Sequence, residues 1–223
     1  MRKFRKSGLA LTVFVAAIIF FAVDGYGQLS SPSSVGKTIF LDSDGNQISN
    51  NEFVDIRLAN FNLKDTSLMR MLEDGTFEFR LQKVPQEGVT APDVRFNRID
   101  GQTLSMAELR GKVVVLNFWF IGCPVCHAEK PQLNELRSKF IDDERIVFIA
   151  VTADSASSVR KFVAKVRFDY IQTADADIVQ KQFVVGSFPK NIVVSKTGEI
   201  VYWRSPVKAW EKFESVIRSE LDK

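Results

Sequence analysis

Three patterns of hydrophobic and polar positions follow one another along the chain. Residues 9–23 are almost entirely apolar, residues 37–84 hold short alternating runs between turn residues, and residues 94–222 alternate apolar runs with segments of helical spacing. A change of pattern marks a change of structural unit. We therefore divide the chain into a targeting segment, a linker, a small strand-rich N-terminal segment and an α/β domain, at residues 1–27, 28–36, 37–90 and 91–223.

The α/β domain is predicted to have a central mixed sheet flanked by helices. Hairpins are expected around Asp100-Gly101 and around the turn at residues 196–199, so part of the sheet is antiparallel. The predicted strands are 94–99, 102–104, 113–119, 146–152, 191–195 and 200–203. The predicted helices are a short one between the capping box Ser105/Glu108 and Gly111, then 124–140, 155–166, 176–183 and one from about residue 207.

The segment 37–84 is predicted to be mostly strand. Two Asp-Gly turns, at Gly45 and Gly75, separate its short apolar runs. The acidic residues around Gly45 do not match a calcium-binding loop, because the glycine comes before Asn46 rather than after the third ligand position. We find no chemistry in this segment.

Basic residues are concentrated at the N-terminus. The chain has 30 Lys and Arg against 27 Asp and Glu, and residues 1–27 hold four of the cations and one of the anions. The rest of the chain is balanced and has no basic tract, which excludes the electrostatic footprint of a nucleic-acid-binding protein.

Residues 1–27 have the parts of an export signal. A basic stretch precedes the apolar run, and small residues follow at Gly25 and Gly27. The run is shorter than the ~20 residues of a typical spanning helix. We expect cleavage after Gly27, with retention as a membrane tether as the alternative. Either outcome exports the rest of the chain to the periplasm or cell envelope.

The only two cysteines, Cys123 and Cys126, directly follow the apolar run 113–120. If a helix opens here, the first sulfur lies at its N-terminus, where unpaired backbone N–H groups favour a thiolate, and the second lies one turn further in. Two thiols at this spacing can close or open a small disulfide ring. Because so small a ring stabilises a fold little, reactivity explains the pair better.

The order of elements, with Cys-x-x-Cys opening the first main helix, resembles the thioredoxin superfamily over about residues 91–222. Pro131 stands where such helices carry a kinking proline, and Pro189 stands where the family holds a cis-proline facing the disulfide. Within the superfamily, the chain resembles the secreted or tethered TlpA/ResA-type thiol-disulfide oxidoreductases, through residues 91–93, 111–119 and 126–131. The resemblance implies a thioredoxin-like fold and disulfide exchange with other proteins.

Two positions depart from the family pattern. Gly122 precedes the first cysteine, where the family usually has Trp, and this change puts the substrate preference in doubt. Asn117 occupies the place of the buried Asp of cytoplasmic thioredoxins, which removes one proton carrier, although Asn is common here in the TlpA/ResA branch. The strand-end aromatic residues Trp119 and Phe120 are expected to pack under the site.

The catalytic residues are predicted to be Cys123, Cys126 and Glu129. Cys123 is the attacking thiolate, because it lies at the helix N-terminus and Pro124, at the first helical position, has no N–H to lose. Cys126 is the more buried, resolving thiol. Glu129 follows three residues later on the same helical face, and the resemblance favours it as the group that exchanges the proton of Cys126. A solvated side chain is the alternative for Glu129.

The resemblance also implies a substrate-binding loop. A cis-Pro189 would present the backbone of Phe188 to an extended segment of the substrate, which pairs with it as a short strand beside the cysteines. We assign Phe188, Pro189, Gly122 and Pro124 to substrate binding.

The run from Cys123 to His127 also fits covalent attachment of a c-type haem. Against a haem-binding electron-transfer protein, this run follows a buried strand and opens a proline-kinked helix. Zinc is set aside, because two cysteines and one histidine leave the usual four-ligand set incomplete. We expect no metal and no organic cofactor.

Two further alternatives use the same fold. A peroxidase would need Thr and Pro at the positions of Phe120 and Leu116. A non-enzymatic module, in which residues 37–84 bind a partner and the rest is a scaffold, has no obvious use for a disulfide-handling site.

We therefore predict an exported thiol-disulfide oxidoreductase that reduces disulfides of other exported proteins. We expect a monomer that receives electrons from an upstream redox partner. Cytochrome c maturation and general repair of misoxidised proteins are both open as its task. The direction of exchange is also open, because single residues do not fix a reduction potential.

Overall fold

The computed structural model describes residues 36–59 and 67–223. The predicted export signal, and the predicted linker up to residue 35, lie outside the described residues. Within the described part of the chain, no helix combines the length and the apolar character needed to cross a membrane.

A small four-stranded sheet comes first. Its order is β2-β1-β4-β3, with β1 and β4 parallel and the two outer pairs antiparallel. The elements are β1 (Thr38–Leu41), β2 (Gln47–Ile48), α1 (Asn50–Ala59), β3 (Ser67–Met71) and β4 (Phe77–Leu81). Both predicted turns join antiparallel neighbours, and their glycines, Gly45 (φ 91°) and Gly75 (φ 80°), adopt the positive φ that glycine tolerates best.

The prediction of mostly strand misses α1. Ser49 begins this helix, because its Oγ accepts a hydrogen bond from Glu52 N (3.1 Å), in the Ser-x-x-Glu spacing typical of a helix start. Phe53 holds the helix on the sheet, with its ring 4.6 Å from that of Phe40. Few other side chains of α1 are buried, so its helical spacing is weak in the sequence.

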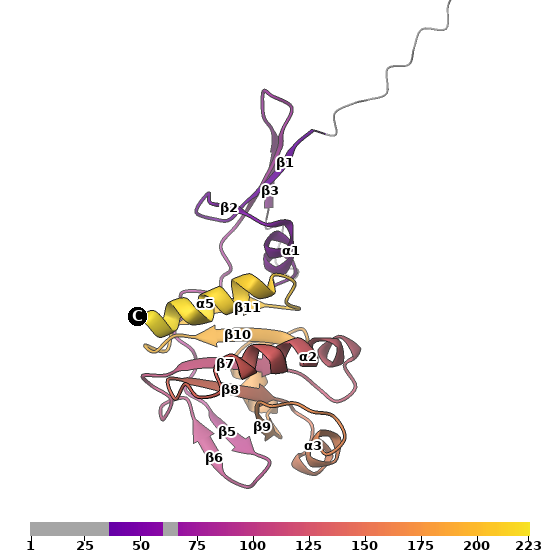
Figure 1. Cartoon of the computed structure of the whole chain (residues 1–223), viewed down its shortest axis with the longest axis vertical. Coiled ribbons are helices and arrows are strands. Elements are labelled where there is room, and N and C mark those ends of the chain that lie inside the picture. The colour runs from indigo at the N-terminus through magenta and orange to yellow at the C-terminus, as the bar shows by residue number, and fades with distance from the viewer. Residues whose placement is uncertain (1–35, 60–66) are drawn as a thin grey trace, which may run out of the picture. The chain divides into compact units, whose positions relative to one another are not determined.

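The larger domain is built on a seven-stranded sheet in the order β11-β10-β7-β8-β9-β5-β6 (Figure 1). The three strands β7, β8 and β9 are parallel, and β10 and β5 on either side of them run antiparallel to this group. The edge strands β11 and β6 are in turn antiparallel to β10 and β5. The strands are β5 (Arg95–Arg98), β6 (Thr103–Ser105), β7 (Val113–Phe118), β8 (Ile146–Val151), β9 (Ile171–Ala174), β10 (Lys190–Val194) and β11 (Ile200–Arg204). The helices are α2 (Pro124–Ser138), α3 (Ala156–Val163), α4 (Asp177–Gln182) and α5 (Trp210–Asp222). The predicted mixed sheet with flanking helices is confirmed.

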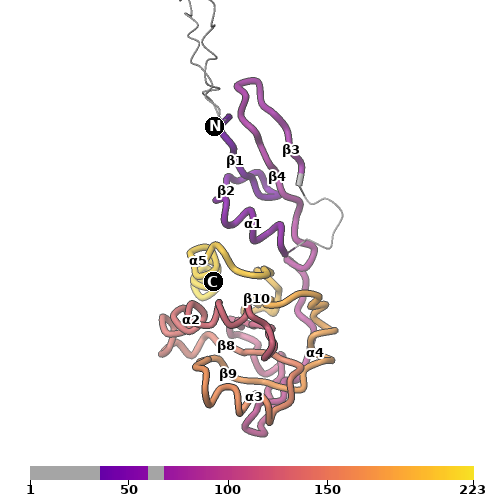
Figure 2. Tube along the Cα trace, turned by 90° about the vertical axis from the view of Figure 1, so that its right-hand side faces the viewer, coloured from indigo at the N-terminus to yellow at the C-terminus, as the bar shows by residue number. Residues whose placement is uncertain are grey.

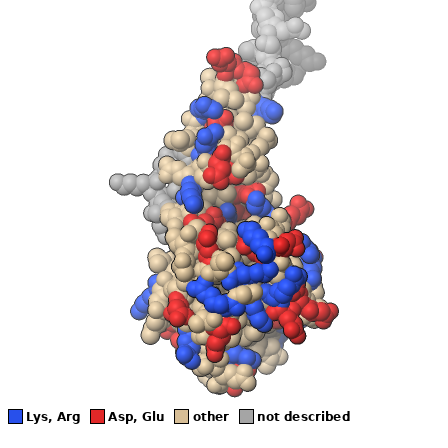
Figure 3. Space-filling view, turned by 90° about the vertical axis from the view of Figure 1, so that its left-hand side faces the viewer, with Lys and Arg blue, Asp and Glu red and all other residues tan. Residues whose placement is uncertain are grey.

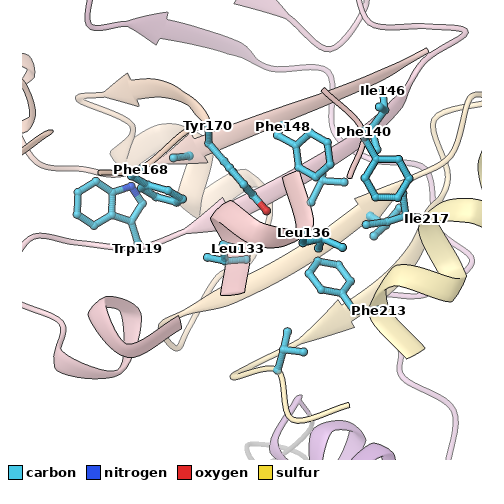
Figure 4. Close-up of a cluster of buried hydrophobic side chains, with 14 of the residues drawn as sticks. Trp119, Leu133, Leu136, Phe140, Ile146, Phe148, Phe168, Tyr170, Phe213 and Ile217 are labelled. Carbon is cyan, nitrogen blue, oxygen red and sulfur yellow. The ribbon is translucent and has the colours of Figure 1, made fainter. Parts of the chain in front are cut away.

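The strand β7 is buried over its whole length. Val113 and Val115 face one hydrophobic core with α2, α3 and α5, whereas Val114 and Leu116 face a second core with α4. Figure 4 shows the first core, where aromatic side chains gather against leucines of α2 and against α5. Because successive side chains of a strand point to opposite faces, a strand buried on both faces needs cover on both.

The predicted short helix before Gly111 is wrong. Its capping-box bonds do form, from Ser105 N to Glu108 Oε2 (2.7 Å) and from Glu108 N to Ser105 Oγ (3.2 Å). Residues 106–111 nevertheless form turns. A segment this short cannot offset the cost of helix nucleation.

The strand β9 is absent from the sequence prediction. It runs between α3 and α4, as the path of the tube in Figure 2 shows. Gln172 and Thr173 interrupt its apolar pattern, yet both are buried, because Thr173 Oγ1 donates to Ala150 O (2.9 Å) and Gln172 Nε2 donates to Phe168 O (3.0 Å). Buried polar side chains therefore hide this strand in the sequence pattern, although Gln172 Oε1 has no hydrogen-bond partner among the described residues.

Charged side chains of both signs occur together on the face shown in Figure 3. The described part of the chain also holds ion pairs between opposite charges, such as Lys139 with Glu214 and Arg145 with Asp143, both at 2.7 Å. This mixture agrees with the balanced charge of the chain after residue 27.

Candidate active site

The two cysteines lie where the chain leaves β7 and enters α2. Cys123 is the N-cap of the helix and Pro124 is its first residue. The cysteines form a disulfide, and Cys123 Sγ accepts a hydrogen bond from Cys126 N (3.1 Å). The exposed fraction is 4% for Cys123 and 2% for Cys126. The first sulfur is thus placed at a helix N-terminus, where N–H groups and the helix dipole stabilise a thiolate once the disulfide opens.

Two side chains from different elements fix the loop before Cys123. Ile121 N donates to Asp154 Oδ2 (2.7 Å), and the same oxygen accepts a hydrogen bond from Thr152 Oγ1 (2.8 Å). Ile121 O lies 2.7 Å from His127 Nε2. Both backbone groups of Ile121 are therefore held. Sequence reasoning misses Asp154, because nothing but its place just after β8 marks it.

Glu129 is buried, with an exposed fraction of 5%, and is not the solvated side chain of the alternative interpretation. Its Oε1 accepts a hydrogen bond from Val207 N (2.6 Å), and its Oε2 accepts one from Asn191 Nδ2 (3.1 Å). Asn191 Oδ1 accepts a hydrogen bond from Asn117 Nδ2 (2.8 Å). Burial raises the pKa of Glu129 from 4.5 to about 7. A carboxyl group with this pKa can both take and release a proton near neutral pH.

The Phe188–Pro189 peptide bond is cis, as the resemblance implies. Ser205 Oγ donates a hydrogen bond to Pro189 O, which holds the loop against β11. The Phe188 side chain packs against the hydrophobic core that includes both cysteines. The predicted binding residues are thus brought near the predicted redox pair.

The prediction that Trp119 and Phe120 both pack under the site is half wrong. Trp119 is fully buried, but Phe120 is 38% exposed. Its ring meets Phe188 edge to face, with centroids 5.4 Å apart. A Cβ atom at Gly122 would lie 3.4 Å from the Phe120 ring, so the glycine leaves room for the ring to fold over it. The two phenylalanines form an aromatic wall, defined as Phe120 and Phe188, that the sequence did not predict.

A buried cation also lies behind the site. Lys130 is 3% exposed, and its Nζ lies over the rings of Trp119 (4.0 Å), Phe168 (5.1 Å) and Phe162 (5.3 Å). Among the described residues its ammonium has no hydrogen-bond partner. Burial lowers the pKa of Lys130 to about 8, and the neighbouring Glu129 opposes this shift.

The cysteines and His127 do not fit covalent haem attachment. Both sulfurs are buried and joined to each other. His127 Nε2 is engaged with Ile121 O, and its ring packs edge to face on Phe162 (5.2 Å). A haem iron would have to displace these contacts.

Comparison with known proteins identifies relatives of the domain. A family model described as Redoxin matches residues 86–218. The thiol-disulfide oxidoreductase ResA of Bacillus cereus is 30% identical over 118 residues, which cover 52% of this chain and 68% of ResA. The thioredoxin-like protein YneN of Bacillus subtilis is 28% identical over 117 residues, or 52% of this chain and 69% of YneN.

A solved structure is also similar to this chain. It is the thioredoxin domain of a thiol-disulfide oxidoreductase from Bacteroides vulgatus, with a TM-score of 0.52 and 25% identity, covering 59% of this chain and 97% of that domain. The predicted thioredoxin-like fold is therefore confirmed. With the family model matching more than half of its length, the chain belongs to the redoxin family of the thioredoxin superfamily, as a thiol-disulfide oxidoreductase with the pair Cys123 and Cys126.

Proposed function

We propose that the chain is an exported reductant of disulfides in other exported proteins. The observation that carries this proposal is the redox pair at the start of α2 with a buried carboxyl group, Glu129, one turn after the inner cysteine. The signal pattern of residues 1–27 supports export to the periplasm or cell envelope, with cleavage after Gly27 or retention as a tether.

The first step is attack by the Cys123 thiolate on one sulfur of a substrate disulfide. A bond forms between Cys123 Sγ and that sulfur, the substrate S–S bond breaks, and the other substrate sulfur leaves as a thiolate. The N-terminus of α2 makes Cys123 the better nucleophile, because its N–H groups stabilise the thiolate.

The second step is release by Cys126. Its thiol loses a proton, attacks Cys123 Sγ and expels the second substrate sulfur, which leaves the chain oxidised and the substrate reduced. Glu129 is the group we assign to take that proton, because its pKa of about 7 suits exchange at neutral pH. An upstream dithiol partner then reduces the Cys123–Cys126 disulfide again.

Substrate binding is assigned to Phe188, Pro189, Gly122 and Pro124. An extended substrate segment would pair with the backbone of Phe188, and the aromatic wall would contact apolar side chains next to the substrate cysteine. Apocytochrome c and misoxidised exported proteins are the two client classes that we propose to compare. The resemblance to TlpA/ResA-type proteins supports the first of them.

The first test is the reduction potential of the pair, measured by equilibration with glutathione and dithiothreitol buffers and thiol labelling. A value near or below about −270 mV supports a reductant, and a value near −120 mV contradicts that direction. Failure to titrate reversibly would refute disulfide exchange altogether.

The second test separates the two cysteines. Cys126→Ser should trap a substrate as a mixed disulfide, because Cys123 can still attack but nothing resolves the product. Cys123→Ser is the matched control and should trap nothing. Full reductase activity in Cys123→Ser would show that the attacking thiol is wrongly assigned.

A further inference from the structure

One acidic residue of the N-terminal segment reaches the turn that binds Glu129. Asp55, in α1, is 1% exposed. Its carboxylate accepts hydrogen bonds from Lys208 N (2.6 Å to Oδ1, 2.8 Å to Oδ2) and from Ala209 N (2.7 Å to Oδ2). The preceding amide in the chain, Val207 N, donates to Glu129 Oε1 (2.6 Å). Three consecutive amides of one turn are thus shared between two buried carboxyl groups.

The start of α5 has no side-chain cap of its own. The N-cap of α5 is Ala209, which cannot accept a hydrogen bond through its side chain. Asp55 therefore supplies, from a distant part of the sequence, the carboxylate that a Ser or Asp at a helix start normally supplies locally. Loss of these bonds would free the turn, and with it the amide that binds Glu129.

We propose that Asp55 is a positioning residue for Glu129: it holds the 207–209 turn, and its charge sets the pH at which Glu129 releases its proton. This inference rests on the proposed function, in which Glu129 accepts the proton of Cys126. It gives the N-terminal segment, which lies outside the residues that the family model matches, a role in the redox site.

The charges around the two carboxyl groups give the direction in which the Glu129 pKa should move when Asp55 loses its charge. The groups that act on Glu129, apart from its hydrogen-bond partners, are Asp55, Lys208, Lys130, Tyr170 and Tyr202. Among these, the negative charge of Asp55 raises the pKa of Glu129, because a second negative charge disfavours ionisation. Arg204 and Lys208 act on Asp55 in turn and favour its charged form, although burial raises the pKa of Asp55 overall.

The test is the titration of the Glu129 carboxyl carbon by NMR in the oxidised, full-length chain. Asp55→Asn removes the charge and keeps one acceptor oxygen for the turn. We expect the Glu129 midpoint to move to lower pH by about 0.3 to 1 pH unit, the order of effect of removing one nearby charge that is partly screened by solvent. Asp55→Glu, which keeps the charge, should restore the midpoint. An unchanged or higher midpoint in Asp55→Asn overturns the proposal.

Glu52→Gln is the matched control. Glu52 lies on the same helix and pairs with Lys212 of α5 (3.3 Å), away from the 207–209 turn. Its substitution removes the same charge from the same helix and should leave the Glu129 midpoint in place. A shift equal to that of Asp55→Asn would show that any loss of charge on α1 suffices, and would overturn the specific role of Asp55.

A reciprocal measurement covers the case in which Asp55→Asn does not fold. Because Asp55 ionises while Glu129 is still protonated, the coupling should appear in the wild-type Asp55 carboxyl signal as a second, smaller inflection at the Glu129 midpoint, and Glu129→Gln should abolish that inflection. An Asp55 signal that does not respond as Glu129 titrates would refute the coupling. Because both readouts are carboxyl titrations, a chain that shows the shifts but exchanges no disulfides refutes the proposed function and leaves the coupling intact.

Discussion

Glu129→Gln tests whether burial in the folded protein destabilises the charged form of the Glu129 carboxyl group. In the folded chain its pKa is about 7, against an ordinary value of 4.5, because burial disfavours the charge. The folded state therefore binds this proton more tightly than the unfolded state. The resulting stability is fully present below pH 4.5 and is lost as the pH rises through 7.

The magnitude follows from the two pKa values. Each unit of difference corresponds to about 1.4 kcal/mol, so wild-type protein should lose about 3 kcal/mol of unfolding free energy between pH 4 and pH 8.5 through this group. A glutamine does not ionise and loses nothing over that range. Its amide can keep the bond from Val207 N, and a flip of the Asn191 side chain can supply an acceptor for its NH₂ group.

The assay is urea unfolding of the oxidised wild type and of Glu129→Gln at several pH values from 4 to 8.5. The difference between their unfolding free energies should shift by about 3 kcal/mol in favour of the variant as the pH rises, with most of the shift between pH 4.5 and 7 and half of it reached at about pH 6. Groups that titrate in both proteins cancel in this difference. Glu135→Gln, an exposed position on the same helix, is the control and should give a flat difference. A difference for Glu129→Gln that is equally flat would refute the burial argument.

Three further changes test neighbouring contacts. Lys130→Met removes a buried ammonium and should raise the unfolding free energy at pH 7 by about 1 to 2 kcal/mol, so a loss of stability in urea unfolding would contradict the reasoning. Asn191→Leu removes a donor to Glu129 and should raise its pKa, which would move the pH profile of disulfide exchange upward; a downward move would show that this bond does not favour the carboxylate. Phe120→Ala opens the aromatic wall and should lower kcat/KM about tenfold for peptides with an apolar residue beside the disulfide. Its reduction by dithiothreitol should stay as in wild type, and an equal loss in both assays would point to damage to the redox pair instead.

The sequence predicts an element well where the apolar positions along the chain coincide with the buried side chains. The runs at β7 and β8 are continuous and apolar because both faces of these strands are covered. The helix α2 follows from Pro124 at its start and from the spacing of its buried residues. The prediction fails where polar side chains are buried, as in β9, or where a helix buries few side chains, as in α1.

The site residues also divide into those that local spacing predicts and those that it misses. Cys123, Cys126 and Glu129 are three residues apart along one helix, so helical geometry alone relates them. Asp154 and Asp55 act through backbone amides of distant loops, and no local spacing marks such contacts. The prediction that Phe120 packs under the site is wrong for a related reason. The exposure of Phe120 depends on the conformation of the loop after β7, and the alternation of strand residues ends before that loop.

Predicting the contact between Asn191 and Glu129 would have required the register of β10 against β7. Once β10 is paired antiparallel with β7, a single register places Asn191 directly opposite Asn117 on the face that carries Glu129. A slip of β10 by one residue would turn Asn191 to the opposite face and leave the carboxyl group with the Val207 amide alone. Both strands are apolar on either side, so hydrophobicity fixes this register weakly, whereas the Asn117–Asn191–Glu129 chain of hydrogen bonds distinguishes it from its neighbours. The hydrogen bonding of the Glu129 carboxyl group and the pairing of two central strands therefore depend on the same three side chains.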